Sequence, residues 1–139
     1  MTESKSTTRH PSGLLDTCVL IDLADIDTAL LPSKAYISTV TLTELGMGIA
    51  VAATPAALAI RTERLLMVEH DFTALPLCTD AARRFTSMAK LVATSGRNPK
   101  PRRMDLMIAA IASTNDLPLF TSNVDDFKDL DPFLTVMPV

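Results

Sequence analysis

The segment from Arg102 to Ala112, RRMDLMIAAIA, constrains the fold of this chain more than any other. Apart from its arginines it carries one polar side chain, that of Asp105, so a helix formed here is apolar on nearly every side. Such a helix must be covered by other elements on most of its faces. Because an ionised carboxylate is costly to bury without a cation, hydrogen bonds or a solvent-filled cleft, Asp105 needs a partner from elsewhere in the chain.

Short β-rich segments alternate with longer segments of helical periodicity along the chain. Leu14 to Ile21, LLDTCVLI, is almost continuously apolar, which is typical of a strand covered on both faces in a parallel sheet. The predicted strands are residues 14–21, 35–40, 72–77, 117–123 and 133–139, and the predicted helices are residues 41–53, 55–70, 81–96 and 102–112. This alternation predicts an α/β domain with a largely parallel sheet of about five strands and helices on both faces.

The length of 139 residues leaves room for one domain with a substantial core. Residues 1–13 are rich in Ser, Thr, Lys and Arg and are predicted to form a flexible tail, so that residues 14–139 make up the single domain. No apolar run reaches the roughly 20 residues that a membrane span requires, and the N-terminal segment lacks the apolar core of a signal peptide. A cytoplasmic protein without membrane association is therefore expected.

Charge and cysteine content narrow the classes of function. A net charge of −3 and a pI of about 5.2 argue against a broad phosphate-binding surface, so a nucleic acid would have to be held by a local patch or through metal ions. Cys18 and Cys78 lie among apolar residues and have neither CxxC nor Cys/His spacing. They are predicted to be small core residues rather than part of a disulfide or a zinc site.

Acidic residues stand near the expected ends of several strands. They are Asp16 in the first strand, Glu44 in the first turn of the helix after the second strand, Asp105, and Asp125 and Asp126 just after the fourth strand. Ligands of open α/β sheets gather outside the carboxyl ends of the strands, where we expect these acids to converge. Carboxylates that face one another disfavour one another's ionisation, so such a group requires a counter-charge.

A divalent metal ion is the simplest counter-charge for this set of acids. Mg²⁺ and Mn²⁺ prefer hard oxygen ligands, and Mg²⁺ commonly combines one or two carboxylates with water and substrate phosphate oxygens. Metal ions about 3.5–4 Å apart can activate water and stabilise the leaving oxygen in phosphodiester hydrolysis. The acidic positions therefore favour a metal-dependent phosphodiesterase.

Four segments, LLDTCVLI, TLTELGMG, RRMDLMIAAIA and LFTSNVDDF, occur in this order and cover the chain from Leu14 onward. Together they resemble the ordered acidic motifs of PIN domains, specifically those of VapC-type toxins, the ribonuclease halves of bacterial toxin–antitoxin pairs. The resemblance implies a three-layer sandwich fold and an endoribonuclease that depends on Mg²⁺ or Mn²⁺. It also implies an RNA substrate, a homodimer, and a VapB-like antitoxin bound in a groove between helices.

The resemblance also assigns roles to individual residues. Asp16, Glu44 and Asp105 would be the first, second and third metal-binding acids, and Thr17 would be a hydrogen-bonding partner of the site. For the fourth acidic place we favour Asp126, with Asn123 and Asp125 as the alternatives.

Simpler structural roles compete with these assignments. Asp105 could pair with Arg102 at the start of its helix, Glu44 could be an ordinary first-turn glutamate, and Asp126 could cap a short helix. The basic segment that contains Arg102 and Arg103 is by default a solvated loop, and its place ahead of Asp105 makes phosphate binding the second interpretation.

Two rival functions remain at this point. One is a PIN-fold module that binds RNA or a protein partner without cleaving RNA. The other is a phosphoacceptor receiver domain, which would require an Asp at the end of the third strand, where Leu77, Cys78 and Thr79 stand instead.

Overall fold

The computed structural model describes residues 9–139. Residues 1–8 of the predicted tail lie outside the described part of the chain. Ser12 and Gly13 already belong to the first strand, and the Arg9 guanidinium donates hydrogen bonds of 2.9 Å to the carbonyls of Leu31 and Pro32. Residues 9–13 of the predicted tail therefore include the start of the first strand and make hydrogen bonds to the rest of the described chain.

A sheet of five parallel strands in the order β3-β2-β1-β4-β5 forms the centre of the molecule, as predicted. The strands are β1 (Ser12–Leu15), β2 (Lys34–Ser38), β3 (Thr73–Leu75), β4 (Leu119–Thr121) and β5 (Val136–Pro138). Leu14 of the central strand β1 pairs with Tyr36 on one side and with Leu119 on the other. Connections between parallel strands must cross over the sheet, which is why helices separate them.

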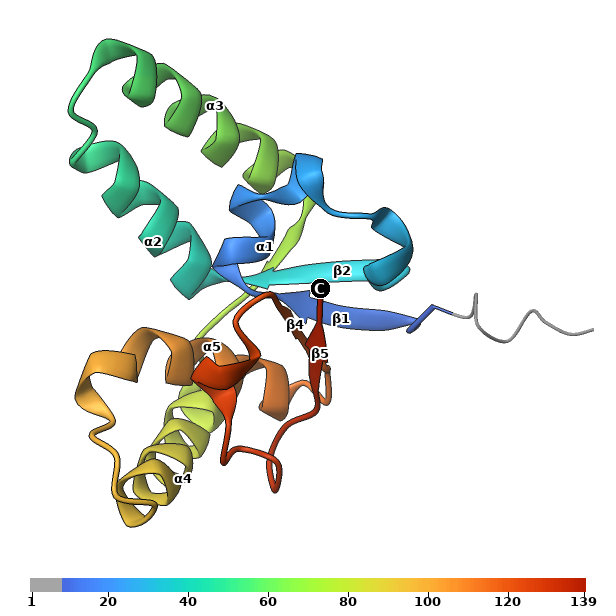
Figure 1. Ribbon diagram of the computed structural model, residues 1–139, viewed down its shortest axis with the longest axis vertical. Helices are drawn as coiled ribbons and strands as arrows, with labels where there is room; N and C mark the ends of the chain where they lie inside the picture. The colour runs from blue at the N-terminus through green and yellow to red at the C-terminus, as the bar shows by residue number, and fades with distance from the viewer. Residues whose placement is uncertain (1–8) are drawn as a thin grey trace, which may run out of the picture.

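The α-helices cover both faces of the sheet, so the architecture is a three-layer sandwich (Figure 1). They are α1 (Thr17–Ile21), α2 (Thr39–Ala50), α3 (Pro55–Asp71), α4 (Thr79–Thr94) and α5 (Arg103–Thr114). On one side α2 and α3 pack together as a hairpin beside α1, and on the other side α4 packs against α5. Short 3-10 turns η2 (Leu23–Asp25), η3 (Thr28–Leu30), η4 (Lys100–Arg102) and η5 (Val124–Phe127) complete the chain.

Successive residues of β1 enter separate cores on the two faces of the sheet. Leu14 is buried in a cluster with residues of α4 and α5, among them Met88 and Ile108. Leu15 is buried in a second cluster with Leu45 of α2 and Val68 of α3. Because side chains alternate across a strand, a central strand covered on both faces must be apolar at every position, as the sequence of β1 indicates.

The predicted first strand is too long. The observed strand β1 ends at Leu15, and residues Thr17–Ile21 form α1 instead. The Asp16 carboxylate caps this helix by accepting a hydrogen bond from the Thr17 amide, and such a cap favours a helix start over a continued strand. A short apolar run does not by itself distinguish a buried strand from a buried helix.

Helix α2 starts at Thr39, two residues before the predicted segment. Its N-cap is Ser38, whose side chain accepts a hydrogen bond from the Thr41 amide. Helix α5 is buried as predicted, with every residue from Ile108 to Ser113 inaccessible or nearly so. The first turn of α5 therefore holds Asp105 on a rigid support.

The prediction that both cysteines are core residues is wrong. Cys78 is exposed, Cys18 is half-buried, and both are free thiols. Within residues 9–139, helices long and apolar enough to cross a membrane are absent.

Candidate functional site

Asp16 stands at the carboxyl end of β1, where the strand gives way to α1. Its side chain is 5% exposed. Oδ1 accepts from the Thr17 amide at 2.9 Å, and Oδ2 accepts from the Thr121 hydroxyl at 2.8 Å and from the Cys18 thiol at 3.4 Å. These hydrogen bonds hold the Asp16 carboxylate in a defined orientation at the carboxyl ends of the strands.

Glu44, on α2, is linked to Asp16 by hydrogen bonds from Thr17, which donates to both carboxylates. The Thr17 hydroxyl donates to Glu44 Oε1 at 2.6 Å and lies 2.9 Å from the Thr41 hydroxyl. Thr41 is in turn held by the Ser38 hydroxyl at 3.2 Å. The residue next to the first acid therefore orients the second acid, which agrees with the hydrogen-bonding role expected for Thr17.

Asp105 lies half-buried in the first turn of α5. Burial and then the nearby carboxylates of Asp16, Asp126 and Glu44 raise the pKa of Asp105 to about 6 from an ordinary value of 3.8, and Arg102 acts in the opposite direction. Three acids from separate segments, Asp16, Glu44 and Asp126, are thus close enough to Asp105 to raise its pKa.

Asp126 extends this group of acids from η5. Its Oδ1 accepts from Arg102 Nη1 at 2.8 Å. The neighbouring Asp125 is exposed and does not contribute to the shift at Asp105. The expected alternative in which Arg102 pairs with Asp105 is therefore wrong, because Arg102 forms its ion pair with Asp126.

The remaining predicted substrate residues are less central. Arg103 is exposed and donates to the Lys100 carbonyl at 2.8 Å. Asn123 is also exposed, and its backbone amide donates to the Thr121 hydroxyl at 3.0 Å. Neither side chain is joined by a hydrogen bond to the acids within residues 9–139.

Sequence reasoning missed two residues of the site, Thr121 and Cys18. Both donate to Asp16 Oδ2, and Cys18 also accepts from the Ser122 hydroxyl at 3.2 Å. Thr121 stands two residues before Asn123 in the fourth acidic segment. Thr121 carries a hydroxyl at the end of β4, the strand that neighbours β1. That position was the signal that could have identified Thr121.

The chemistry of the site fits a small divalent cation. Asp16, Glu44, Asp105 and Asp126 supply carboxylate oxygens, the hard ligands that Mg²⁺ and Mn²⁺ prefer. Across residues 9–139, however, no three acidic, His or Cys side chains already stand close enough to enclose an ion.

A groove of about 660 Å³ leads away from Glu44 between α1, α2 and α3. Its wall is largely apolar, and Arg61 and Arg64 of α3 line its far side. Arg61 Nη1 donates to the Gly48 carbonyl at 2.6 Å, which joins the two helices of the hairpin. The residues that line the groove are Thr17, Ile21, Glu44, Leu45, Gly48, Ala57, Ile60, Arg61 and Arg64.

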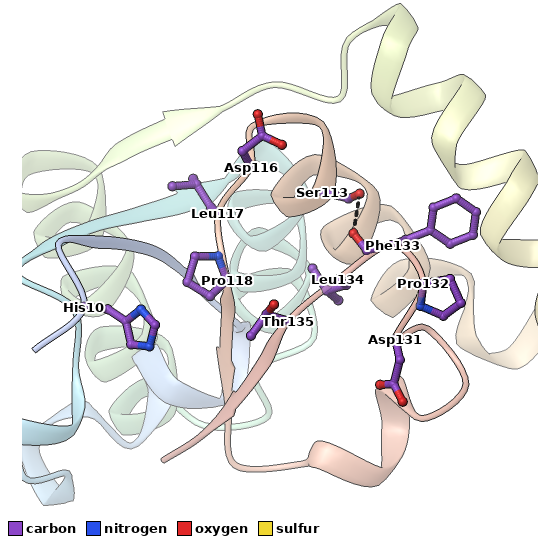
Figure 2. Close-up of a pocket in the computed structure, with 10 residues that line it drawn as sticks. All are labelled: His10, Ser113, Asp116, Leu117, Pro118, Asp131, Pro132, Phe133, Leu134 and Thr135. Atoms are coloured by element: carbon purple, nitrogen blue, oxygen red, sulfur yellow. Dashed lines mark hydrogen bonds between the residues drawn. The ribbon is translucent and has the colours of Figure 1, made fainter.

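A second hollow, of about 430 Å³, lies at the amino ends of β1, β4 and β5, away from the acids. His10, Asp116 and Asp131 are its titratable residues, and the Ser113 hydroxyl on its wall donates to the Phe133 carbonyl at 2.8 Å (Figure 2). None of the four converging acids lines this hollow. The candidate chemistry is therefore confined to the opposite edge of the sheet.

Comparison with known proteins agrees with this geometry. The model of the PIN domain family matches residues 13–131. Ribonuclease VapC5 of Mycobacterium tuberculosis is 40% identical over 129 residues, which cover 89% of this chain and 91% of that protein.

Solved structures show the same fold. The crystal structure of VapBC-5, a member of the VapBC family of toxin–antitoxin systems from Mycobacterium tuberculosis, matches with a TM-score of 0.82 and 39% identity, covering 93% of this chain and 99% of that chain. VapBC2 of Rickettsia felis, solved with a DNA fragment from its promoter, matches with a TM-score of 0.76 and 17% identity, covering 92% of this chain and 98% of that chain. At this lower identity the likeness concerns the fold alone.

Proposed function

The chain belongs to the PIN domain family, and from this premise we propose that it is an endoribonuclease dependent on Mg²⁺ or Mn²⁺, the toxin of a type II toxin–antitoxin pair. Its similarity to Ribonuclease VapC5 supports the reaction. The observation that carries the metal dependence is the convergence on Asp105, where Asp16, Asp126 and Glu44 all oppose ionisation.

In this proposal Asp16, Asp105, Glu44 and Asp126 hold the cation. A bound divalent cation supplies the chemistry of a Lewis acid, lowering the pKa of a water nucleophile and stabilising the charge of the leaving oxygen. The protein contributes orientation. Hydrogen bonds from Thr17, Thr121 and Cys18 fix Asp16, Thr17 also fixes Glu44, and the buried helix α5 fixes Asp105.

A VapB-like antitoxin is the proposed protein partner, as the similarity to the VapBC-5 complex supports. The groove between α1, α2 and α3 is suited to it, because it combines apolar walls with an opening at Glu44. A segment bound there would restrict access to the acids. The proposal also includes a homodimer and a cytoplasmic location, where RNA substrates are found.

RNA cleavage is the direct test of the enzymatic proposal. Purified protein without its antitoxin should cleave structured RNA in Mg²⁺ or Mn²⁺, and EDTA should stop the reaction. Asp16→Asn and Asp105→Asn should remove cleavage, while Asp25→Asn, which changes an exposed acid outside the site by the same charge, should leave it intact.

A module that binds without cleaving is the remaining alternative, and the incompletely closed acid cluster is the observation in its favour. It predicts that the protein retains RNA in a binding assay but neither cleaves it nor binds Mn²⁺ in a calorimetric titration. Full activity of Asp105→Asn would instead refute the metal-site assignment while leaving the family unchanged.

A further inference from the structure

Arg102 is the basic residue placed directly against the acids. It ends η4, one residue before α5 begins. Its Nη1 atom lies 2.8 Å from Asp126 Oδ1 and 3.4 Å from the Asp126 carbonyl oxygen. One guanidinium nitrogen therefore contacts both the side chain and the backbone of the same residue, which restricts the rotamer of Asp126.

The backbone that carries Arg102 is itself restricted. Pro99 and Pro101 flank Lys100, and the Arg102 amide donates to the Pro99 carbonyl at 3.1 Å. Proline fixes its own φ and limits the residue before it. The segment therefore has fewer alternative conformations than an ordinary basic loop, and the guanidinium starts from a defined position beside α5.

Charge explains why Asp126 needs such a contact. The Asp126 carboxylate lies close enough to Asp105 to raise its pKa, as do Asp16 and Glu44, and like charges at such a site repel one another. Asp126 is 38% exposed, so water is within reach and a rotation toward solvent would relieve the repulsion. Arg102 opposes this rotation by donating a hydrogen bond to Asp126 Oδ1. The other carboxylate oxygen of Asp126, Oδ2, accepts no hydrogen bond from residues 9–139.

We propose that Arg102 is a positioning residue that holds Asp126 facing Asp105, with one carboxylate oxygen available to a divalent cation, instead of serving mainly as a phosphate clamp. This inference rests on the proposed metal-dependent function and deepens it. It also explains how Asp126, and not Asp125, is the acid presented to the site.

Stability of the fold is a poor measure of this role. The two side chains are 34% and 38% exposed, and ion pairs of this kind contribute little to folding. Replacement of Arg102 should therefore leave the fold intact and change the affinity of the site for metal, because partners that orient metal ligands commonly affect affinity by about tenfold or more.

Calorimetric titration of Mn²⁺ into the metal-free full chain tests the inference. Arg102→Ala should weaken Mn²⁺ binding by about tenfold, and Arg102→Lys should restore part of the loss because it keeps the charge. Arg83→Ala is the control, since it removes the same charge from an exposed pair with Asp80 on α4, and it should bind Mn²⁺ like the wild type. Circular dichroism and thermal melting confirm that each variant folds.

A double-mutant cycle shows whether Arg102 acts through Asp126. In an Asp126→Asn background, the further change Arg102→Ala should have no added effect on Mn²⁺ affinity. Equal losses with and without Asp126 would overturn the inference, and so would Mn²⁺ affinity that is unchanged or tighter in Arg102→Ala. A rise in KM for RNA at saturating Mn²⁺, with Mn²⁺ affinity unchanged, would assign Arg102 to phosphate binding instead.

The wild-type titration separates this inference from the proposed function. If wild-type protein does not bind Mn²⁺ at all, the metal-dependent function fails and this role of Arg102 fails with it. If the wild type binds Mn²⁺ and cleaves RNA while Arg102→Ala binds Mn²⁺ equally well, only the role assigned to Arg102 is wrong.

Discussion

Replacing Asp105 by Asn is expected to stabilise the metal-free protein at neutral pH while removing cleavage. The physical reason is that the folded state raises the pKa of Asp105 to about 6 from 3.8, mainly through burial and then through neighbouring carboxylates. Ionised Asp105 therefore costs free energy in the fold that it does not cost in the unfolded chain. Asparagine has nearly the same shape and no charge.

The sign and the pH window follow from proton linkage. Below about pH 3 Asp105 is largely protonated in both states, so the cost is small. As the pH rises from about 4 to about 6 the unfolded chain loses the proton first, and the stability of the wild type falls. The full difference corresponds to about 3 kcal/mol, and because Asp105 is partly exposed, solvent screening reduces the expected value to about 1–2 kcal/mol.

Thermal and urea unfolding in EDTA provide the assay. At pH 8 Asp105→Asn should unfold at a temperature higher by about 3–8 °C, and at pH 4 most of the gain should disappear. Saturating Mg²⁺ should reduce the gain as well, since it binds the wild type more tightly. Asp125→Asn, an exposed neighbour of the fourth acid, is the control for charge and should change little. A gain of equal size at pH 4 and pH 8, or no gain at pH 8, would refute the electrostatic reasoning.

Three further changes test the packing and hydrogen bonds that support the site. Gly13→Ala would place a Cβ 2.3 Å from Phe120 Cε1, so a loss of about 1–3 kcal/mol is expected in urea unfolding, and a wild-type midpoint would contradict the close approach. Thr121→Val removes a donor to Asp16 and an acceptor for the Asn123 amide. It should cost about 1–3 kcal/mol and weaken Mn²⁺ binding, while Thr121→Ser should recover both, and equal behaviour of the two variants would exclude a role for the hydroxyl. Gly96 has a φ of +89° at the end of α4, so Gly96→Ala should lower stability by about 1–2 kcal/mol, with a raised melting temperature as the contrary result.

Local sequence patterns were reliable where one interaction dominates. The apolar segment from Leu106 to Ala112 was correctly predicted as part of a buried helix, and Pro55 marks the first residue of α3, as the sequence indicated. Local sequence patterns were less reliable where a strand and a helix are equally compatible with the same run of residues. The segment from Thr17 to Ile21 is apolar enough for a strand, and the capping bond between Asp16 and the Thr17 amide makes it a helix.

The partner of Arg102 illustrates the limit of local reasoning about the site. In the sequence its nearest acid is Asp105, at a spacing that suits a helical ion pair. In the structure it binds Asp126, 24 residues away, because Arg102 lies just before α5 and η5 packs against that helix. Asp125 and Asp126 are adjacent and chemically identical, so only the direction in which the turn presents each one separates them.

The sequence by itself determined the alternation of strands and helices, the burial of α5 and the order of the acids, since these depend on periodicity and on the residue types along one segment. Only the tertiary structure decided that burial and the carboxylates of Asp16, Asp126 and Glu44 raise the pKa of Asp105, and that Thr121 and Arg102 donate hydrogen bonds to two of these acids. The physical reason is that hydrogen bonds and Coulomb interactions depend on distances of a few ångströms between atoms. Those distances are set by how the parallel strands align and how the helices pack on them.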